Sequence, residues 1–234
     1  MSTTPSADIP TLTLDGRFRV PADVFTLQRF REWVHGKDFP EKGRAAFIAG
    51  SVEVEMSPEN LDTHNAVKGE INGILLQFVK QRRLGRLYVD GALLVCPAAD
   101  LSNGPDGMFC SHDSRRSGRV KQKEWTKGSG IPVEVVGVPD VVLEVVSPSS
   151  VRKDTKLLRT QYHKAGIPEY WLVDARGKKI QFQILVRGED EYSPSAPDAD
   201  GFRRSPVLNA SFSLVRESDE FGEFEYHLLH REKP

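Results

Sequence analysis

The segment PDVVLEVVSPSS, residues 139–150, constrains the fold most strongly because it places a carboxylate inside an apolar run. Its central part, Val141–Val146, is apolar except for Glu144, and such a run is typical of a strand covered on both faces. A carboxylate there costs free energy unless a cation, hydrogen bonds or water at the strand end compensate it. Val142 and Val146 share the face of Glu144, so solvating the carboxylate would expose both valines. The segment therefore predicts a buried, functional Glu144.

Length and composition predict one folded domain with appendages. The chain has 234 residues, of which 38% are hydrophobic and 28% charged, as is ordinary for a globular protein. No apolar run approaches the roughly 20 residues of a membrane span, and the polar first ten residues do not resemble a secretory signal. Cys96 and Cys110 form neither a disulfide framework nor a metal-ligand spacing, so we expect a cytoplasmic protein that does not act at a membrane. We predict an arm over residues 1–24, a single domain over 25–220 and a tail over 221–234.

The charges are balanced overall but clustered locally. The formal net charge of −1 says nothing about a nucleic-acid partner. Two local runs of basic residues are more informative about such a partner, because basic loops beside an acidic site suit a phosphodiester ligand. For either run alone, solvated surface charge explains the sequence equally well. The runs consist of Arg115, Arg116, Arg119, Lys121, Lys123 and Lys127, and of Arg152, Lys153, Lys156, Arg159 and Lys164.

A strand, a helix and a second strand follow one another around residue 150. The strand 141–146 leads into a predicted helix over residues 154–165, which Gly166 ends, with Pro168 just beyond. The next apolar segment, 169–174, predicts a strand. This order implies a right-handed crossover that makes the two strands parallel. The alternating segment 179–186 then predicts an antiparallel neighbour, reached through the turn at 174–177.

The remaining elements follow from apolar periodicity. We predict a short helix over 25–34, a longer helix over 62–82, and short strands within 188–219. We also predict strands over 46–56, 87–95, 107–110 and 133–136, the last forming a hairpin with 141–146. These elements together predict an α/β fold.

Asp106 is the second acidic candidate. It stands in the sequence NGPDG, residues 103–107, which alone is a turn signal. However, a predicted strand follows it directly. Carboxylates on neighbouring strands, about 5 Å apart, can share a divalent cation. Asp140 is four residues from Glu144 on one strand, about 13 Å away, so we expect it to act as a hydrogen-bonding residue at the strand start.

The helix over 62–82 adds two further candidates. His64 falls close to the apolar face, which favours a buried, hydrogen-bonded histidine over a ligand. Glu70 lies at the edge of that face and could reach the site from the side, although a solvated glutamate is the simpler interpretation. We expect Tyr162, Tyr170 and Trp171 to serve packing.

These residues carry a resemblance to a known family. Asp106, Glu144 and the segment 139–174 resemble the bacterial Uma-two family of putative restriction endonucleases, within the PD-(D/E)XK nuclease superfamily. The resemblance covers about residues 25–214 and is most specific in PDVVLEVVSPS, 139–149, and AGIPEYWLVD, 165–174. It implies a restriction-endonuclease-like mixed β-sheet flanked by helices. It further implies Mg²⁺ or Mn²⁺ bound by Asp106 and Glu144, a catalytic lysine, DNA as the substrate and a homodimer.

The lysine departs from the family pattern. The usual superfamily position, two residues after the second acid, is Val146. In many family members the lysine stands four residues after an aspartate that matches Asp154, and that position is Leu158 in this chain. Lys153 and Lys156 lie nearby, and a lysine near phosphate can orient water or stabilise developing charge. We weigh both as catalytic candidates, with Lys153 slightly favoured, against surface lysines at a helix start.

A second departure leaves two functions open. Ala49–Ser51 stands where many relatives have Asp-Gly-Glu, so a ligand from that turn is missing. The leading hypothesis is a metal-dependent endonuclease acting on DNA, a substrate that the sequence does not distinguish from RNA. The alternative is a catalytically degenerate nuclease-fold module that binds nucleic acid or protein.

Overall fold

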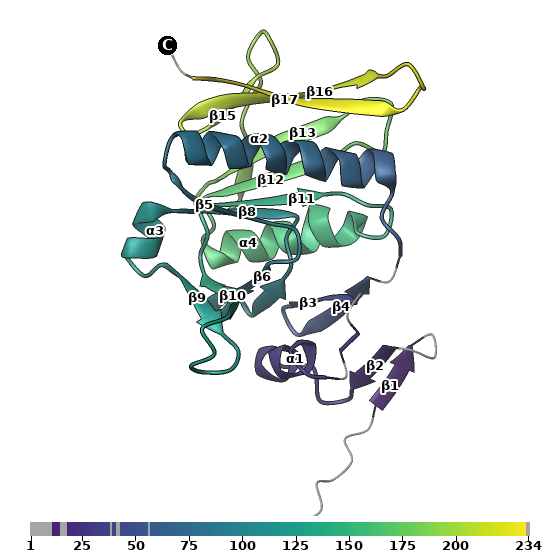
Figure 1. The fold of residues 1–234 in the computed structure, drawn as a ribbon, viewed down its shortest axis with the longest axis vertical. Helices are drawn as coiled ribbons and strands as arrows, with labels where there is room; N and C mark the ends of the chain where they lie inside the picture. The colour runs from purple at the N-terminus through teal and green to yellow at the C-terminus, as the bar shows by residue number, and fades with distance from the viewer. Residues whose placement is uncertain (1–10, 15–17, 38, 41–42, 56, 233–234) are drawn as a thin grey trace, which may run out of the picture.

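A computed structural model describes residues 11–14, 18–37, 39–40, 43–55 and 57–232. The described residues form a mixed α/β fold in which two six-stranded sheets are flanked by helices (Figure 1). The predicted fold class is thereby confirmed. None of the described helices has the length and apolar character needed to cross a membrane.

The central sheet contains the strand with Glu144. Its strand order is β14-β13-β12-β11-β8-β5. The strands are β5 (Gly85–Val89), β8 (Gly107–Ser111), β11 (Val141–Val145), β12 (Glu169–Asp174), β13 (Gln181–Arg187) and β14 (Tyr192–Pro194). β11 is parallel to β12 and antiparallel to β8, so the predicted parallel pairing across the helix is confirmed.

The other strands form a second six-stranded sheet, called the flanking sheet, and two smaller groups. The flanking sheet has the order β4-β3-β7-β6-β10-β9, the C-terminal sheet β15-β16-β17, and β1 pairs with β2. Their bounds are β1 (Thr11–Leu14), β2 (Phe18–Pro21), β3 (Arg44–Ile48), β4 (Ser51–Glu55), β6 (Leu93–Cys96), β7 (Leu101–Asn103), β9 (Val120–Glu124), β10 (Pro132–Gly137), β15 (Arg203–Ser205), β16 (Ala210–Ser218) and β17 (Phe224–Glu232).

The helices cover both faces of the central sheet. In Figure 1, α2 lies between the central and C-terminal sheets, and α4 lies on the other side of the central sheet. The helical segments are α1 (Leu27–Val34), η1 (Leu61–Ala66), α2 (Val67–Gln81), η2 (Pro97–Ala99), α3 (His112–Arg116), η3 (Lys153–Leu158) and α4 (Arg159–Ala165). η1 and η3 are π-helical turns that open α2 and α4, and Gly166 ends α4 with a φ of +84°, as predicted.

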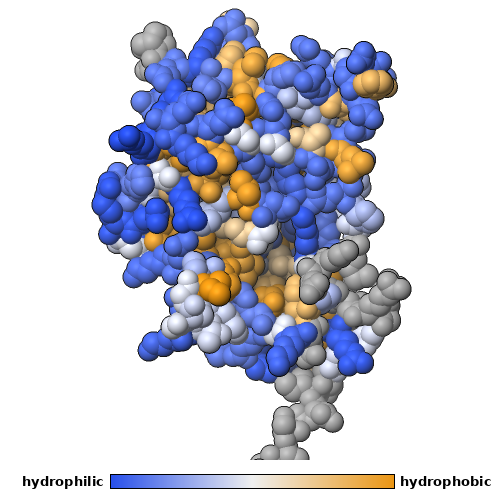
Figure 2. All heavy atoms as spheres, in the orientation of Figure 1, coloured by the Kyte–Doolittle hydropathy of each residue, from blue (hydrophilic) through white to orange (hydrophobic). Residues whose placement is uncertain are grey.

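Burial of β11 follows the predicted alternation. Val141, Leu143 and Val145 pack with α2 and the C-terminal sheet, whereas Val142 and Val146 pack with α4 and the flanking sheet. Glu144 shares this second face, so it points into the layer between the two large sheets. Hydrophilic side chains cover most of the face seen in Figure 2, with apolar patches between them.

The predicted hairpin between 133–136 and 141–146 is wrong. β10 pairs with β6 and β9 in the flanking sheet, whereas β11 lies in the central sheet. Gly137 permits the change of sheet, because it has a φ of +118° and an added Cβ would lie 2.1 Å from the carbonyl oxygen of Arg119. The side chain of Asp140 then accepts hydrogen bonds from the Ser111 N–H and the Ser114 hydroxyl and pairs with Arg119, as expected for a structural residue.

Two segments that were predicted as single strands are divided by turns. Within the predicted strand 46–56, the described residues 46–55 belong to the hairpin of β3 and β4, which turns at Ala49 and Gly50, both at positive φ, and residue 56 lies outside the described residues. Residues 87–95 give β5 and β6, which lie in different sheets on either side of Gly91 (φ +85°). Turn signals, Gly50 and the pair Asp90-Gly91, are present in the sequence, but the apolar residues on both sides of each were interpreted as one strand. The predicted boundaries at residues 24 and 220 stay a prediction, although β17 pairs with β16 along nine residues.

Glu134 joins α1 to the flanking sheet, and we expect Glu134→Gln to lower stability by about 2 kcal/mol at pH 7. Its buried carboxylate pairs with Arg31 and lies 3.0 Å from Nε2 of His35. Burial acts to raise the pKa of Glu134, but hydrogen bonds from His35 and Arg31 dominate and lower it to about 2. Since the folded pKa is depressed, this stability is present above the ordinary glutamate pKa and is lost as pH falls toward 2. Urea unfolding of wild type and Glu134→Gln measures this effect. The difference between their free energies of unfolding should be smaller at pH 3 than at pH 7. An equal difference at both pH values would contradict a stabilising role of the Glu134 charge.

Candidate functional site

A cavity of about 270 Å³ lies where the central sheet, the flanking sheet and the end of α1 meet. Acidic side chains dominate its charged lining, and most of them come from the ends of strands or the turns beside them. The lining carboxylates belong to Glu53, Glu55, Asp90, Asp106, Glu144 and Asp154, whereas Arg44 and Lys153 are the lining cations among the described residues. A neutral ligand gains nothing from this excess of negative charge, but a cation does.

Glu144 lies near the end of β11, and only 2% of its surface is exposed. Oε1 accepts hydrogen bonds from Asn103 Nδ2 at 2.8 Å and from the Tyr162 hydroxyl at 2.6 Å. No donor among the described residues pairs with Oε2. Burial, together with the charges of Asp154 and Asp106, raises the pKa of Glu144 well above the usual range. The carboxyl group is therefore held through one oxygen and has the other available.

Asp106 comes to the same place through the pairing of β8 with β11. Leu143 pairs with Gly107, so Asp106, one residue earlier, lies opposite Glu144. Oδ2 of Asp106 accepts a hydrogen bond of 2.7 Å from the Val145 N–H, and the side chain is 5% exposed. Burial raises the pKa of Asp106 against the opposing effects of neighbouring cations and of the Val145 N–H. The two predicted acids are thus brought together on neighbouring strands.

The two predicted lysines are placed differently. Lys153 lines the cavity, and its Nζ lies 3.6 Å from Oδ1 of Asp154 and 3.8 Å from Oε2 of Glu55. Burial acts to lower the pKa of Lys153, but the charge of Glu144 and the other carboxylates outweighs it, and the net shift is upward. Lys156 is exposed and does not line the cavity. Leu158 is fully buried in the core, so that position faces away from the cavity.

Asp154 is a site residue that the sequence interpretation did not include. It is 1% exposed; Oδ2 accepts a hydrogen bond from the Ser150 hydroxyl, whereas Oδ1 has no hydrogen-bond partner among the described residues. Burial raises the pKa of Asp154 to about 7, although Lys153 and Ser150 oppose the shift. The available signal was its position directly after Lys153, on the first turn of a helix that begins at the end of β11.

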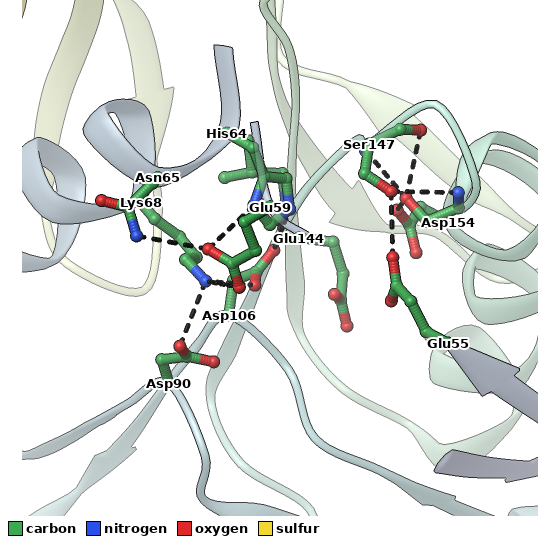
Figure 3. A network of polar contacts seen from close by, with 12 residues as sticks. Glu55, Glu59, His64, Asn65, Lys68, Asp90, Asp106, Glu144, Ser147 and Asp154 are labelled. Atoms are coloured by element: carbon green, nitrogen blue, oxygen red, sulfur yellow. Dashed lines mark hydrogen bonds and ion pairs between the residues drawn. The ribbon is translucent and has the colours of Figure 1, made fainter. Parts of the chain in front are cut away.

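The structure also brings His64 into the site. His64 is 6% exposed and lines the cavity, with Nε2 3.8 Å from Oδ2 of Asp106 and Nδ1 3.5 Å from Oε2 of Glu59 (Figure 3). Lys68, one helical turn later, places Nζ 3.7 Å from Oδ1 of Asp106 and 2.7 Å from Glu59. The helical periodicity of the segment did predict burial, but it did not predict that His64 faces an acid.

Three further residues make structural hydrogen bonds around the site. Glu70 accepts a hydrogen bond of 2.8 Å from the N–H of Leu228 in β17 and does not line the cavity. Tyr162 is buried in the core as expected, and it also donates to Glu144. Glu55 joins β4 to the loop after β11, because it accepts hydrogen bonds from Ser149 at 2.8 Å and Ser147 at 3.2 Å.

The donor set suits a hard divalent cation. Carboxylate oxygens are the ligands that Mg²⁺ and Mn²⁺ prefer, and Oε2 of Glu144 has no competing donor among the described residues. In the described part of the chain, no three His, Cys, Asp or Glu side chains are arranged to hold a metal by themselves. That agrees with Mg²⁺, which is usually bound through one or two carboxylates and retains several waters. Asp106 and Glu144 fit such a two-carboxylate site.

One solved structure shares the fold of this chain. A putative nuclease of the DUF820 family from Anabaena variabilis ATCC 29413, solved by crystallography, is similar to this chain, with a TM-score of 0.57 and 18% sequence identity. The match covers 78% of this chain and 90% of the Anabaena protein. At this identity the likeness establishes the fold alone.

The sequence model of the Uma2 (Uma-two) family, described as "putative restriction endonuclease", matches residues 27–216. The chain belongs to this family, which confirms the resemblance recognised in its motifs. No curated protein matches the sequence.

Proposed function

We propose that the protein is a metal-dependent endonuclease that hydrolyses phosphodiester bonds of DNA. The observation that carries the proposal is that Asp106 and Glu144 lie opposite each other on neighbouring strands and line one acidic cavity together with Lys153. Asp106 and Glu144 would hold Mg²⁺ or Mn²⁺. The bound ion would supply the polarisation of the phosphate and the activation of water.

The residues around the pair set its geometry and charge. Asn103 and Tyr162 orient the Glu144 carboxylate, and the Val145 N–H orients that of Asp106. Lys153 would stabilise charge that develops on the phosphate or orient the attacking water. Lys156 would contribute only to backbone binding, because it lies outside the cavity.

Basic side chains outside the cavity would hold the DNA backbone without reading its sequence. Arg119 is engaged with Asp140. All six basic residues of the first run, Arg119 included, are exposed, and Arg116 pairs with Asp113.

A degenerate nuclease-fold module remains the second candidate, and two observations favour it. The β3–β4 turn of Ala49, Gly50 and Ser51 offers no carboxylate, and the alternative lysine position is occupied by the buried Leu158. Such a module would bind nucleic acid or protein through the same surface without needing a metal.

Calorimetric titration of Mn²⁺ into wild type and Glu144→Ala, with and without a short DNA, separates the two candidates. We expect metal binding to wild type that weakens at least about tenfold in the variant, because a carboxylate ligand is lost. Circular dichroism of Glu144→Ala should match wild type. Absence of specific Mn²⁺ binding to the wild type, even with DNA present, would favour the degenerate module.

A further inference from the structure

The acids of the site lie at the bottom of the cavity rather than on the surface. Asp106, Glu144 and Asp154 are 5%, 2% and 1% exposed, and all three line the cavity. In the view of Figure 3, Glu144 lies between the groups around Asp106 and those around Asp154. A scissile phosphate that is to meet a metal on Asp106 and Glu144 must therefore enter the cavity.

Another part of the cavity wall is apolar. The side chains of Val34, Ala45, Val54 and Leu93 contribute to it, and Ala45 and Val54 are directly paired across the β3–β4 hairpin. An apolar surface of this kind binds neither a metal ion nor a phosphate group. Apolar walls with a few polar groups at one end are typical of sites that hold a flat organic ring.

An aromatic pair stands beside this apolar part. His35 lines the cavity, and Trp125 stacks on it with ring centroids 4.3 Å apart and an interplanar angle of 27°. The indole is 39% exposed, and the guanidinium of Arg31 lies 6.0 Å from its centroid. Exposed aromatic rings near a cation bind unpaired bases by stacking, with little dependence on base identity.

An intact duplex does not suit this arrangement. Its bases are paired inside a stiff helix, so drawing one phosphate and its base into a cavity requires unpairing that costs a few kcal/mol. An unpaired strand enters without that cost. The buried acids, the apolar wall and the exposed indole thus all favour a flexible strand.

We propose that the site acts on unpaired DNA, with one base held against the apolar wall formed by Val34, Ala45, Val54 and Leu93, and a neighbouring base stacked on Trp125. This inference rests on the proposed nuclease function and specifies its substrate. A single strand, a flap or an unpaired loop meets the requirement.

The first test compares three labelled DNAs of one sequence in Mn²⁺: a single strand, its full duplex, and a duplex with an internal unpaired loop. We expect the single strand and the loop to be cleaved at least about tenfold faster than the duplex, given the cost of unpairing. Cleavage of the duplex at an equal or higher rate would overturn the inference.

Two variants locate the contacts. Ala45→Phe places a bulky side chain in the space beside the apolar wall, where the base would lie. The variant should lose activity on the single strand and on a small chromogenic phosphodiester without a base to different extents. We expect the loss on the single strand to be at least about tenfold larger. Trp125→Ala should weaken single-strand binding by about tenfold, the effect of losing one stacked base. Leu229→Phe, on the exposed face of β17, is the control and should change neither measurement.

The outcomes separate this inference from the nuclease proposal. Equal losses on both substrates in Ala45→Phe, or unchanged binding in Trp125→Ala, would overturn the base site while leaving the nuclease intact. If wild type hydrolyses neither DNA nor the small phosphodiester and does not bind Mn²⁺, the nuclease proposal fails, and the base site fails with it.

Discussion

Glu144→Gln should lower DNA cleavage by on the order of 10³-fold, because it removes a charged ligand worth several kcal/mol of transition-state stabilisation. Glutamine retains a side-chain oxygen that can accept from Asn103 and Tyr162, so the hydrogen bonds that position the group persist. It also removes a negative charge near Asp106 and Asp154. We therefore expect a melting temperature equal to or above that of wild type. Initial cleavage rates in Mn²⁺ and thermal unfolding by circular dichroism measure the two effects.

The conservative substitution distinguishes a ligand from a structural partner. If Glu144 mainly stabilised the fold through its charge, Glu144→Gln would unfold at lower temperature and lose activity in proportion to the unfolded fraction. Glu169→Gln is a useful comparison, because Glu169 is also buried but accepts hydrogen bonds from Trp171, Ser205 and Val207 away from the cavity. We expect Glu169→Gln to change the stability of the protein rather than the chemistry of cleavage.

Replacing the two candidate lysines should have unequal effects. Lys153→Ala should reduce cleavage by about 10²-fold, the low end of what a positioned proton-transfer or charge-stabilising group contributes. Lys156→Ala should stay within about twofold of wild type, because its exposed side chain does not line the cavity. Single-turnover cleavage rates at saturating DNA measure both, so that a change in binding does not obscure a change in the chemical step.

The comparison of Lys153→Ala with Lys156→Ala tests which lysine takes part in cleavage. If Lys156→Ala lowered the cleavage rate more than Lys153→Ala, Lys156 rather than Lys153 would be the catalytic lysine. Equal, small effects of both would leave the site without a catalytic lysine and strengthen the case for the degenerate module. Lys153→Met retains much of the apolar stem and thus separates the loss of charge from the loss of packing.

Prediction from the sequence succeeded where one segment carried its own signal. The apolar run of β11 with one carboxylate, the helix that Gly166 ends and the strand β12 were all recognisable, since burial and local backbone conformation leave a periodic pattern. Asp106 and Glu144 were also proposed to lie on neighbouring strands, and β8 does pair with β11, although no periodic pattern predicted that pairing.

Prediction failed where the answer depended on long-range pairing. The segments 133–136 and 141–146 read as a hairpin but belong to different sheets, because Gly137 lets the chain pass between layers. The partners of Glu144 were equally hidden. Asn103 reaches it from 41 residues away and Tyr162 from 18, and neither position carries a local sign of that contact.

The sequence by itself determined the fold class, the family and the burial of Glu144, because apolar periodicity and turn residues act over a few positions. Only the tertiary structure decided which polar groups surround those acids. Lys153 faces the cavity and Lys156 does not, His64 approaches Asp106, and Asp154 lines the cavity with Oδ1 close to Lys153. The physical reason is that a site is built from distant segments, whose meeting depends on strand register and crossover rather than on local propensity.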